Sequence, residues 1–258
     1  MKIALIQSDI AWNSPVENIT RCEALALEAI DAGAELLIFP EMFTCGFSMP
    51  EGDVAKESYT RGLSFLSATA QKHNVAALGS IPETSPSGEL FNTAIVATPN
   101  GETTSYRKIH LFSYGDETKK YSPGSKLLTT KIGEVRCSIF ICYDLRFPLP
   151  FHHVAEHTDL YIVVANWPAP RREHWLTLLR ARAIENQAYI AGVNRAGEGG
   201  GLQYSGDSVV FAPDGTQLTE LTSQQAVIMC DIDPQKVAEW REVFPAVKDR
   251  RPTVYSGM

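Results

Sequence analysis

The sequence predicts a mixed α/β structure in which helices cover two β-sheets. Strand-like and helix-like segments alternate through the first half of the chain, and hairpin-like pairs appear in the middle and near the end. Roughly a dozen segments have strand character, which favours two sheets over one. The 258 residues contain no internal repeat, linker or low-complexity segment. Residues 1–258 are therefore expected to form one domain.

The composition is typical of a soluble globular protein, with 44% hydrophobic and 21% charged residues. A net charge of −7 argues against a broad nucleic-acid-binding surface, and the basic pairs Lys119-Lys120 and Arg171-Arg172 are interpreted as solvated surface. No apolar stretch is long enough to span a bilayer, and the first apolar run breaks at Gln7, too early for a signal peptide. A cytoplasmic location without a membrane partner is expected.

The first half of the chain alternates buried strands with helices. A strand is predicted where a short apolar run stops at a turn, and a helix where apolar residues recur every three to four positions. The Asn100-Gly101 dipeptide predicts a tight hairpin turn. The predicted strands are 2–8, 34–39, 75–81, 90–98 and 103–111, and the predicted helices are 16–32 and 57–73.

The second half follows the same rules after a loop over residues 113–126. The glycine run 197–201 is interpreted as a mobile loop, and Pro213-Asp214-Gly215 as a turn. The predicted strands are 135–142, 160–165, 189–193, 204–211 and 226–232, and the predicted helices are 149–157 and 173–187.

Cys142 ends the strand 135–142, in which β-branched residues alternate with others as in a strand buried on both faces. The carboxyl ends of buried strands are where open α/β sheets build their sites. Cys142 is therefore a candidate nucleophile, and the alternative is that it is one more small buried hydrophobic residue. The five cysteines are odd in number and lack CxxC spacing, so neither a disulfide framework nor a zinc site is predicted.

Two further reactive groups lie at comparable positions. Glu41 follows the end of the strand 34–39, and Lys108 lies in the second strand of the hairpin. If they meet Cys142, the carboxylate can take the thiol proton and the ammonium can stabilise negative charge, including a tetrahedral oxyanion shared with a backbone N–H such as that of Tyr143. Water activated through Glu41 would then hydrolyse the thioester. This chemistry requires no metal or organic cofactor.

The segments FPEMF, YRKIHLF and ICYDLRFP resemble those of the nitrilase superfamily of carbon–nitrogen hydrolases. Their catalytic Glu, Lys and Cys match Glu41, Lys108 and Cys142, in order and spacing, and the resemblance covers nearly the whole chain. It implies a two-sheet α-β-β-α sandwich. It also implies a second glutamate that positions the substrate and the lysine, which Glu117 matches; the alternative is that Glu117 is a solvated loop charge.

The segments EMFTCGFSM, NWPAPRREHW, RARAIENQAY and SGDS look like the omega-amidase branch of that superfamily. Those enzymes hydrolyse the terminal amide of 2-oxoglutaramate and 2-oxosuccinamate, releasing ammonia and a 2-oxo dicarboxylate. Another amidase of the superfamily, acting on deaminated glutathione or an N-carbamoyl compound, remains an alternative. So does a non-catalytic binding subunit of the same fold, although no member of the triad is missing.

A substrate with a distal carboxylate requires a cation or several hydrogen-bond donors in its pocket. Arg146 is the candidate nearest Cys142 in sequence, and the alternative is a structural role. The expected substrate-binding residues are Tyr143, Arg146, Asn166, Trp167, Phe43 and Tyr204.

His153 and His157 have the spacing of a metal-binding pair, but no third ligand accompanies them, and a polar helix face is the better account. No metal site is predicted. The resemblance further implies a homodimer formed through helices near the nucleophile and through a C-terminal tail, expected as an extended segment over residues 244–258.

Overall fold

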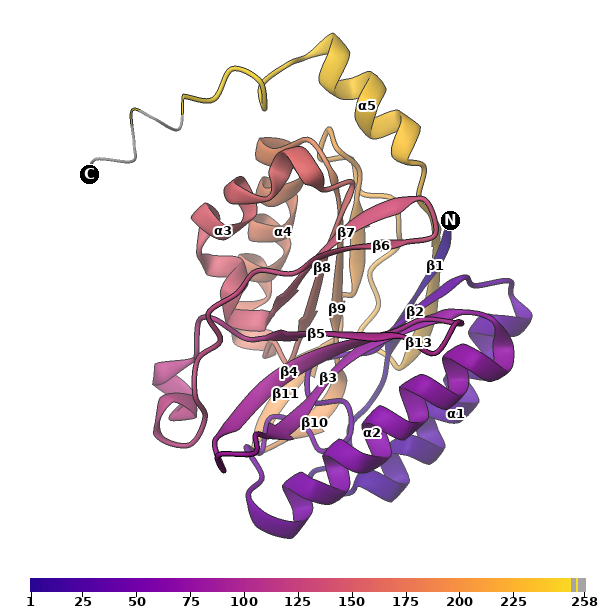
Figure 1. Ribbon diagram of the computed structural model, residues 1–258, viewed down its shortest axis with the longest axis vertical. Coiled ribbons are helices and arrows are strands. Elements are labelled where there is room, and N and C mark those ends of the chain that lie inside the picture. Colours follow the sequence, from indigo (N-terminus) through magenta and orange to yellow (C-terminus); the bar gives the residue numbers. More distant parts are fainter. Residues whose placement is uncertain (252–253, 255–258) are drawn as a thin grey trace.

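The computed structural model describes residues 1–251 and residue 254. Two β-sheets pack against each other, and helices cover the outer face of each sheet (Figure 1). This arrangement confirms the predicted α-β-β-α sandwich. The described residues include no helix with the length and apolar character that crossing a membrane requires.

The first sheet has six strands in the order β13-β1-β2-β3-β4-β5. Strands β1, β2 and β3 are parallel, while β4, β5 and β13 pair antiparallel with their neighbours. Its strands are β1 (Lys2–Gln7), β2 (Leu36–Ile38), β3 (Ala76–Thr84), β4 (Leu90–Ala97), β5 (Thr103–Arg107) and β13 (Ala226–Asp231).

The second sheet has five strands in the order β12-β9-β8-β7-β6, with β7, β8 and β9 parallel. A separate two-stranded hairpin, β10-β11, lies between β9 and β12 in the chain. These strands are β6 (Thr129–Ile132), β7 (Val135–Ile141), β8 (Leu160–Ala165), β9 (Tyr189–Asn194), β10 (Ala196–Gly199), β11 (Leu202–Ser205) and β12 (Val209–Phe211).

Helices α1 and α2 pack on the first sheet, and α3 and α4 on the second (Figure 1). A fifth helix, α5, follows β13 and extends beyond the sheets; it was not among the predicted helices. The predicted helix 149–157 is shorter than expected, because α3 ends at His153 and a 3₁₀ turn follows. The helices are α1 (Pro15–Asp31), α2 (Gly52–His73), α3 (Pro148–His153), α4 (Arg172–Asn186) and α5 (Pro234–Val243).

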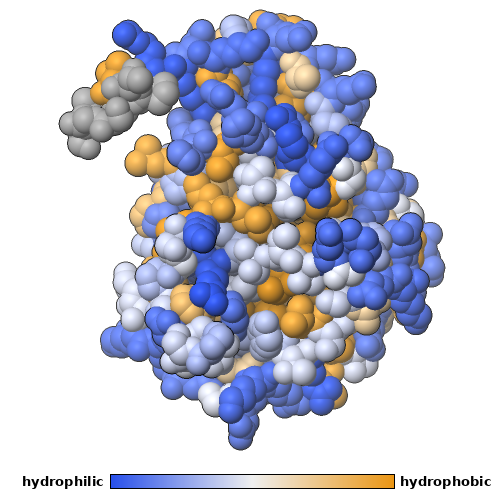
Figure 2. All heavy atoms as spheres, viewed as in Figure 1, coloured by the Kyte–Doolittle hydropathy of each residue, from blue (hydrophilic) through white to orange (hydrophobic). Residues whose placement is uncertain are grey.

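The alternation in β7 shows how the sheets share the core. Cys137 and Ile139 face the apolar layer between the two sheets, whereas Phe140 faces α3 and stacks on Phe151 with ring centroids 3.9 Å apart. Both faces of the strand are therefore buried, as its sequence predicts. On the surface seen in Figure 2, hydrophobic residues gather near the middle of the molecule and hydrophilic ones dominate the periphery.

The segment around the glycine run differs from the prediction of a mobile loop. It forms the β10-β11 hairpin, with Gly200 and Gly201 at its tip in left-handed conformations (φ 58° and 75°) that suit a tight turn. The predicted strand 204–211 is also wrong as a single element. It breaks between β11 and β12 because Gly206 and Asp207 adopt positive φ angles of 61° and 55°.

The C-terminal tail is described only in part. Residues 244–251 return toward α3 and α4, where the Arg250 guanidinium donates to the carbonyl oxygens of His152 and Glu185 at 3.1 and 2.7 Å. The rest of the predicted tail, apart from residue 254, lies outside the described residues.

Candidate active site

Three segments from the two sheets converge on one site. Glu41 lies three residues beyond β2, Lys108 directly follows β5, and Cys142 directly follows β7. The side chain of Lys108 is close enough to the other two for their charges to act on its pKa. The structure thus brings together the three residues that the sequence singled out.

Lys108 forms a completely buried ion-pair network with two glutamates. Its Nζ lies 2.9 Å from Glu41 Oε1 and 2.9 Å from Glu117 Oε2, and all three side chains are 0% exposed. Burial alone would lower the pKa of Lys108, but the two carboxylates outweigh it and raise the pKa above its usual range. The lysine is therefore a permanent cation at neutral pH.

Glu117 is not a solvated loop charge. A 3₁₀ turn, Glu117–Lys119, places its side chain inward, and Oε2 accepts a 2.6 Å hydrogen bond from the Phe112 backbone N–H. Burial and the charge of Glu41 raise its pKa, while Lys108 opposes that rise. The second predicted glutamate thus lies within the network.

Glu41 is held by donors on both carboxylate oxygens. Oε1 accepts from Lys108 and, at 2.7 Å, from Asn92 Nδ2, while Oε2 accepts from the Asn166 backbone N–H at 2.8 Å. Met42, which follows it, has φ 48°, so the chain turns sharply after the glutamate. These contacts fix one orientation of the carboxylate.

Cys142 occupies a strained turn at the end of β7. Its φ of 45° is unusual for a residue with a side chain, and such strain persists only where surrounding contacts impose it. The buried carboxylate of Asp144 supplies those contacts, accepting from the Ile141 N–H at 3.0 Å, the Tyr106 hydroxyl at 2.8 Å and the His110 N–H at 2.9 Å. Asp144 thereby links the turn that bears Cys142 to the segment around Lys108.

The thiol of Cys142 is protonated at rest. Burial raises its pKa, the charge of Glu41 raises it further, and Lys108 only partly opposes both. The Cys142 thiol donates to the Asn166 carbonyl oxygen at 4.0 Å, and the Glu41 carboxylate is close enough for its charge to act on the thiol. Because only the thiolate attacks a carbonyl carbon, this cysteine needs a base at the moment of reaction, and Glu41 is in place to serve as one.

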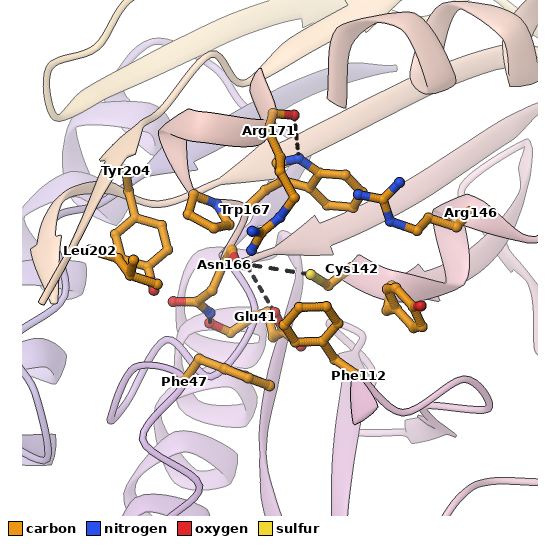
Figure 3. Close-up of a pocket in the computed structure, with 12 residues that line it drawn as sticks. Glu41, Phe47, Phe112, Cys142, Arg146, Asn166, Trp167, Arg171, Leu202 and Tyr204 are labelled. Carbon is orange, nitrogen blue, oxygen red and sulfur yellow. Dashed lines mark hydrogen bonds between the residues drawn. The ribbon is translucent and has the colours of Figure 1, made fainter. Parts of the chain in front are cut away.

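Cys142 and Glu41 lie at the floor of a pocket with about 430 Å³ of empty space (Figure 3). Aromatic and basic side chains form most of its wall. Two wall residues, Leu202 and Tyr204, come from β11, so the hairpin that contains the glycine run contributes directly to the site. The lining residues are Glu41, Phe47, Phe112, Cys142, Tyr143, Arg146, Asn166, Trp167, Pro168, Arg171, Leu202 and Tyr204.

Two arginines of the wall have no carboxylate partner among the described residues. Arg146 lies over the Trp167 ring, 4.9 Å from its centroid, and its Nη2 is 3.2 Å from His174 Nδ1. The Arg171 guanidinium carbon is 5.5 Å from the centroid of the Phe112 ring. The interpretation of Arg171 as solvated surface was therefore wrong.

Five of the six predicted substrate-binding residues line the pocket, and Phe43 does not. Phe43 packs against Phe39 and Phe65 in the core between the first sheet and α2, with ring centroids 5.3 and 6.0 Å away. Phe47 occupies the pocket wall instead, because the chain turns at Gly46 (φ 70°) between the two phenylalanines. Five residues of the wall were not among the predicted site residues, and neither was Asn92 beneath the floor; the five are Phe47, Phe112, Pro168, Arg171 and Leu202.

The histidine pair shows no sign of a metal centre. His153 ends α3 and His157 lies on the following 3₁₀ turn, so they do not share one regular helix face. Within residues 1–251, no group of three or more His, Cys, Asp or Glu side chains is arranged to hold a metal ion.

Comparisons with known proteins agree with this geometry. A sequence model of the carbon–nitrogen hydrolase family matches residues 2–242. The omega-amidase YafV of Escherichia coli is 38% identical over 251 residues, covering 96% of each chain, and the 2-oxoglutaramate amidase of Bacillus subtilis is 34% identical, covering 98% of each. The crystal structure of XC1258 from Xanthomonas campestris, a CN-hydrolase superfamily protein with an arsenic adduct in its active site, superposes with a TM-score of 0.88 at 34% identity over 97% of each chain.

Proposed function

The chain belongs to the carbon–nitrogen hydrolase family, and we propose that it is an omega-amidase that uses Cys142 as its nucleophile. Its substrates are 2-oxo dicarboxylate monoamides such as 2-oxoglutaramate and 2-oxosuccinamate. The observation that carries the proposal is that a thiol and a carboxylate meet at the floor of one pocket, with a buried ammonium paired to that carboxylate. The names of full-length relatives support the choice of substrate.

Acylation of the enzyme begins with transfer of the Cys142 proton to Glu41. The thiolate sulfur attacks the amide carbon, and the carbonyl π electrons move to the oxygen, which becomes an oxyanion. Lys108 Nζ and the Tyr143 backbone N–H stabilise that oxyanion. When the tetrahedral intermediate collapses, the C–N bond breaks and Glu41 returns its proton to the nitrogen. Ammonia departs, and the acyl group remains bound to Cys142 as a thioester.

Deacylation repeats these steps with water as the nucleophile. Glu41 takes a proton from water, the hydroxide oxygen attacks the thioester carbon, and the C–S bond breaks. Glu41 then returns the proton to the sulfur. The net reaction converts one amide and one water into one carboxylic acid and one ammonia, which at neutral pH become a carboxylate and an ammonium ion, and the protein requires no redox partner for it. Glu117 shares Lys108 with Glu41 and holds the ammonium in place during both halves.

The two wall arginines are suited to the far end of such a substrate. A 2-oxo dicarboxylate monoamide carries a carboxylate at the end opposite its amide, and a guanidinium binds a carboxylate through two parallel hydrogen bonds. Arg171 and Arg146 both face the pocket without a carboxylate partner in the described chain, and Arg171 has fewer contacts that would hold it elsewhere. We assign Arg171 the main role in binding that carboxylate and Arg146 a supporting one.

The test is ammonia release from 2-oxoglutaramate, succinamate, deaminated glutathione and a simple nitrile, with Cys142→Ala as the control. Preferred turnover of the first two, lost in the variant, is the expected result. Preference for deaminated glutathione would keep the mechanism and place the enzyme among other amidases of the family. If no compound gave release that depends on Cys142, the proposal would fail and a non-catalytic role would gain support.

We also propose that the protein forms a homodimer through the face made by α3, α4 and the segment after α5. Large hydrophobic side chains are exposed on these elements, Leu149 on α3 and Ile184 on α4, and also at Val243, which ends α5, and Phe244, which follows it. Sedimentation equilibrium of the full chain measures the mass directly. Double substitution of Val243 and Phe244 by serine is expected to raise the dimer dissociation constant.

A further inference from the structure

Asn92 lies on β4 directly beneath the site and is 0% exposed. Its carbonyl oxygen accepts the Lys108 backbone N–H at 2.9 Å. Its side-chain Nδ2 donates to Glu41 Oε1 at 2.7 Å and to Glu117 Oε1 at 3.3 Å. One residue therefore contacts the lysine and both glutamates of the buried network.

The orientation of the Asn92 amide is set by Ser80 on the adjacent strand β3. The Met42 backbone N–H donates to Ser80 Oγ at 2.9 Å, and the Ser80 hydroxyl hydrogen in turn points to Asn92 Oδ1, also 2.9 Å away. The amide oxygen is thereby occupied by a donor. Both amide hydrogens are left to face carboxylates, which act only as acceptors when ionised.

The network contains more negative than positive charge. Glu41 and Glu117 share the single ammonium of Lys108, so an ionised pair leaves one carboxylate charge uncompensated on side chains that are completely buried. The thiols and phenols of Cys45, Cys142, Tyr121 and Tyr204 lie close enough to interact with the charge of one or both glutamates. Burial raises the pKa of each, so at neutral pH they are uncharged and add no further negative charge. The pocket wall adds the guanidinium groups of Arg146 and Arg171.

We infer that Asn92 is a positioning residue that holds Glu41 aimed at Cys142 by donating one amide hydrogen to each glutamate. An N–H that bonds to a carboxylate favours its charged form. Only the charged form of Glu41 can accept the thiol proton. The inference rests on the proposed role of Glu41 as a base, and not on which amide the enzyme hydrolyses.

The test measures the reaction of Cys142 with iodoacetamide across pH in the full-length protein, followed by mass spectrometry of the peptide that contains this cysteine. Because no substrate is involved, the result is independent of the omega-amidase assignment. In Asn92→Leu, a variant of similar shape without the amide, the acid limb of the rate profile is expected to move up by about one pH unit. At a fixed pH well below the midpoint of that limb, the alkylation rate should fall roughly tenfold.

Two further variants separate this role from a loss of packing. Thr93→Val alters the next residue of β4, whose hydroxyl donates to Glu83 at 2.7 Å and contacts no residue of the site; its profile should match the wild type. Ser80→Ala keeps Asn92 but removes the hydroxyl that orients its amide. The acid limb of the alkylation-rate profile should therefore move to higher pH, by less than in Asn92→Leu. If Asn92→Leu fails to fold, Ser80→Ala decides alone. An acid limb unmoved in every folded variant of Asn92 and Ser80 would overturn the inference.

Discussion

The floor and the wall of the pocket hold their charges in opposite ways. At and beneath the floor, Lys108 and its two glutamates are completely buried and bonded to one another. In the wall, Arg146 and Arg171 face the cavity with no carboxylate partner among residues 1–251. The charges of the floor are therefore paired within the protein, whereas the two arginines of the wall leave room for the substrate carboxylate that we propose they bind. We assign the chemical steps to the residues of the floor and substrate recognition to the arginines of the wall, so substitutions can test the two roles separately.

The largest expected effect comes from removing the nucleophile in the floor. Cys142→Ala should lower kcat/KM on the order of 10⁴-fold or more, because no other group can form the thioester. The fold should persist, since the contacts of Asp144 impose the left-handed turn and an alanine can occupy it. Steady-state kinetics and a thermal melt measure the two quantities. Residual turnover above about one per cent would remove Cys142 from this role.

Lys108→Met should damage both activity and stability. Removal of the ammonium leaves two buried carboxylates without a cation, which costs about 3–5 kcal/mol when a buried ion pair loses one partner. For a chain of this size, that corresponds to a fall in Tm of about 10 °C. Activity should fall on the order of 10³-fold as oxyanion stabilisation is lost. Near-normal rates would show that the oxyanion is held by other donors.

The sequence predicted the floor far better than the wall. Glu41 and Cys142 follow the ends of buried strands, and the position of a strand end can be read from an apolar run that stops at a turn. Phe47 and Arg171 lie in connections whose paths depend on contacts with distant segments. Phe43 and Phe47 cannot be told apart by pattern, because the turn at Gly46 decides which of them reaches the cavity.

Asn92 escaped detection for another reason. It lies within a strand rather than at its end, so nothing local distinguishes it from a structural polar residue. Its partners are 51 and 25 positions away along the chain. Similarly, adjacent arginines suggest solvated surface, yet Arg172 pairs with Asp207 at 2.7 Å while Arg171 turns into the pocket.

That adjacent pair provides a matched test of the wall. Arg171→Met should raise KM for 2-oxoglutaramate roughly 10- to 100-fold, the effect of losing a charge-assisted bond worth about 1.5–3 kcal/mol, with a much smaller change in kcat. Turnover of a neutral amide should hardly change, because it has no carboxylate to lose. Arg172→Met removes the same charge one residue away and should leave KM unaltered. If both variants raised KM equally, the effect would come from the overall positive charge near the pocket and not from a carboxylate-binding site at Arg171.

The smallest expected effect concerns Arg107, the neighbour of Lys108 in sequence. Arg107 pairs with Glu83 at 2.6 Å, but its side chain is 37% exposed, so water and salt screen the pair and its contribution to stability is about 1 kcal/mol or less. Burial tends to raise the pKa of Glu83, but hydrogen bonds from Arg107 and Thr93 prevail and lower it below its usual range.

A carboxyl group whose pKa is lower in the folded protein stabilises the fold above its unfolded pKa of about 4.3, and this contribution is lost as pH falls through the folded value. Glu83→Gln should therefore lower Tm by about 2 °C at pH 7, and the difference from the wild type should shrink below pH 4. High salt should shrink it as well. If Glu83→Gln lowered Tm as much as Lys108→Met does, and salt did not change the effect, Arg107 would belong to the buried network. The greater exposure of Arg107 would then not explain a difference between these two neighbouring cations.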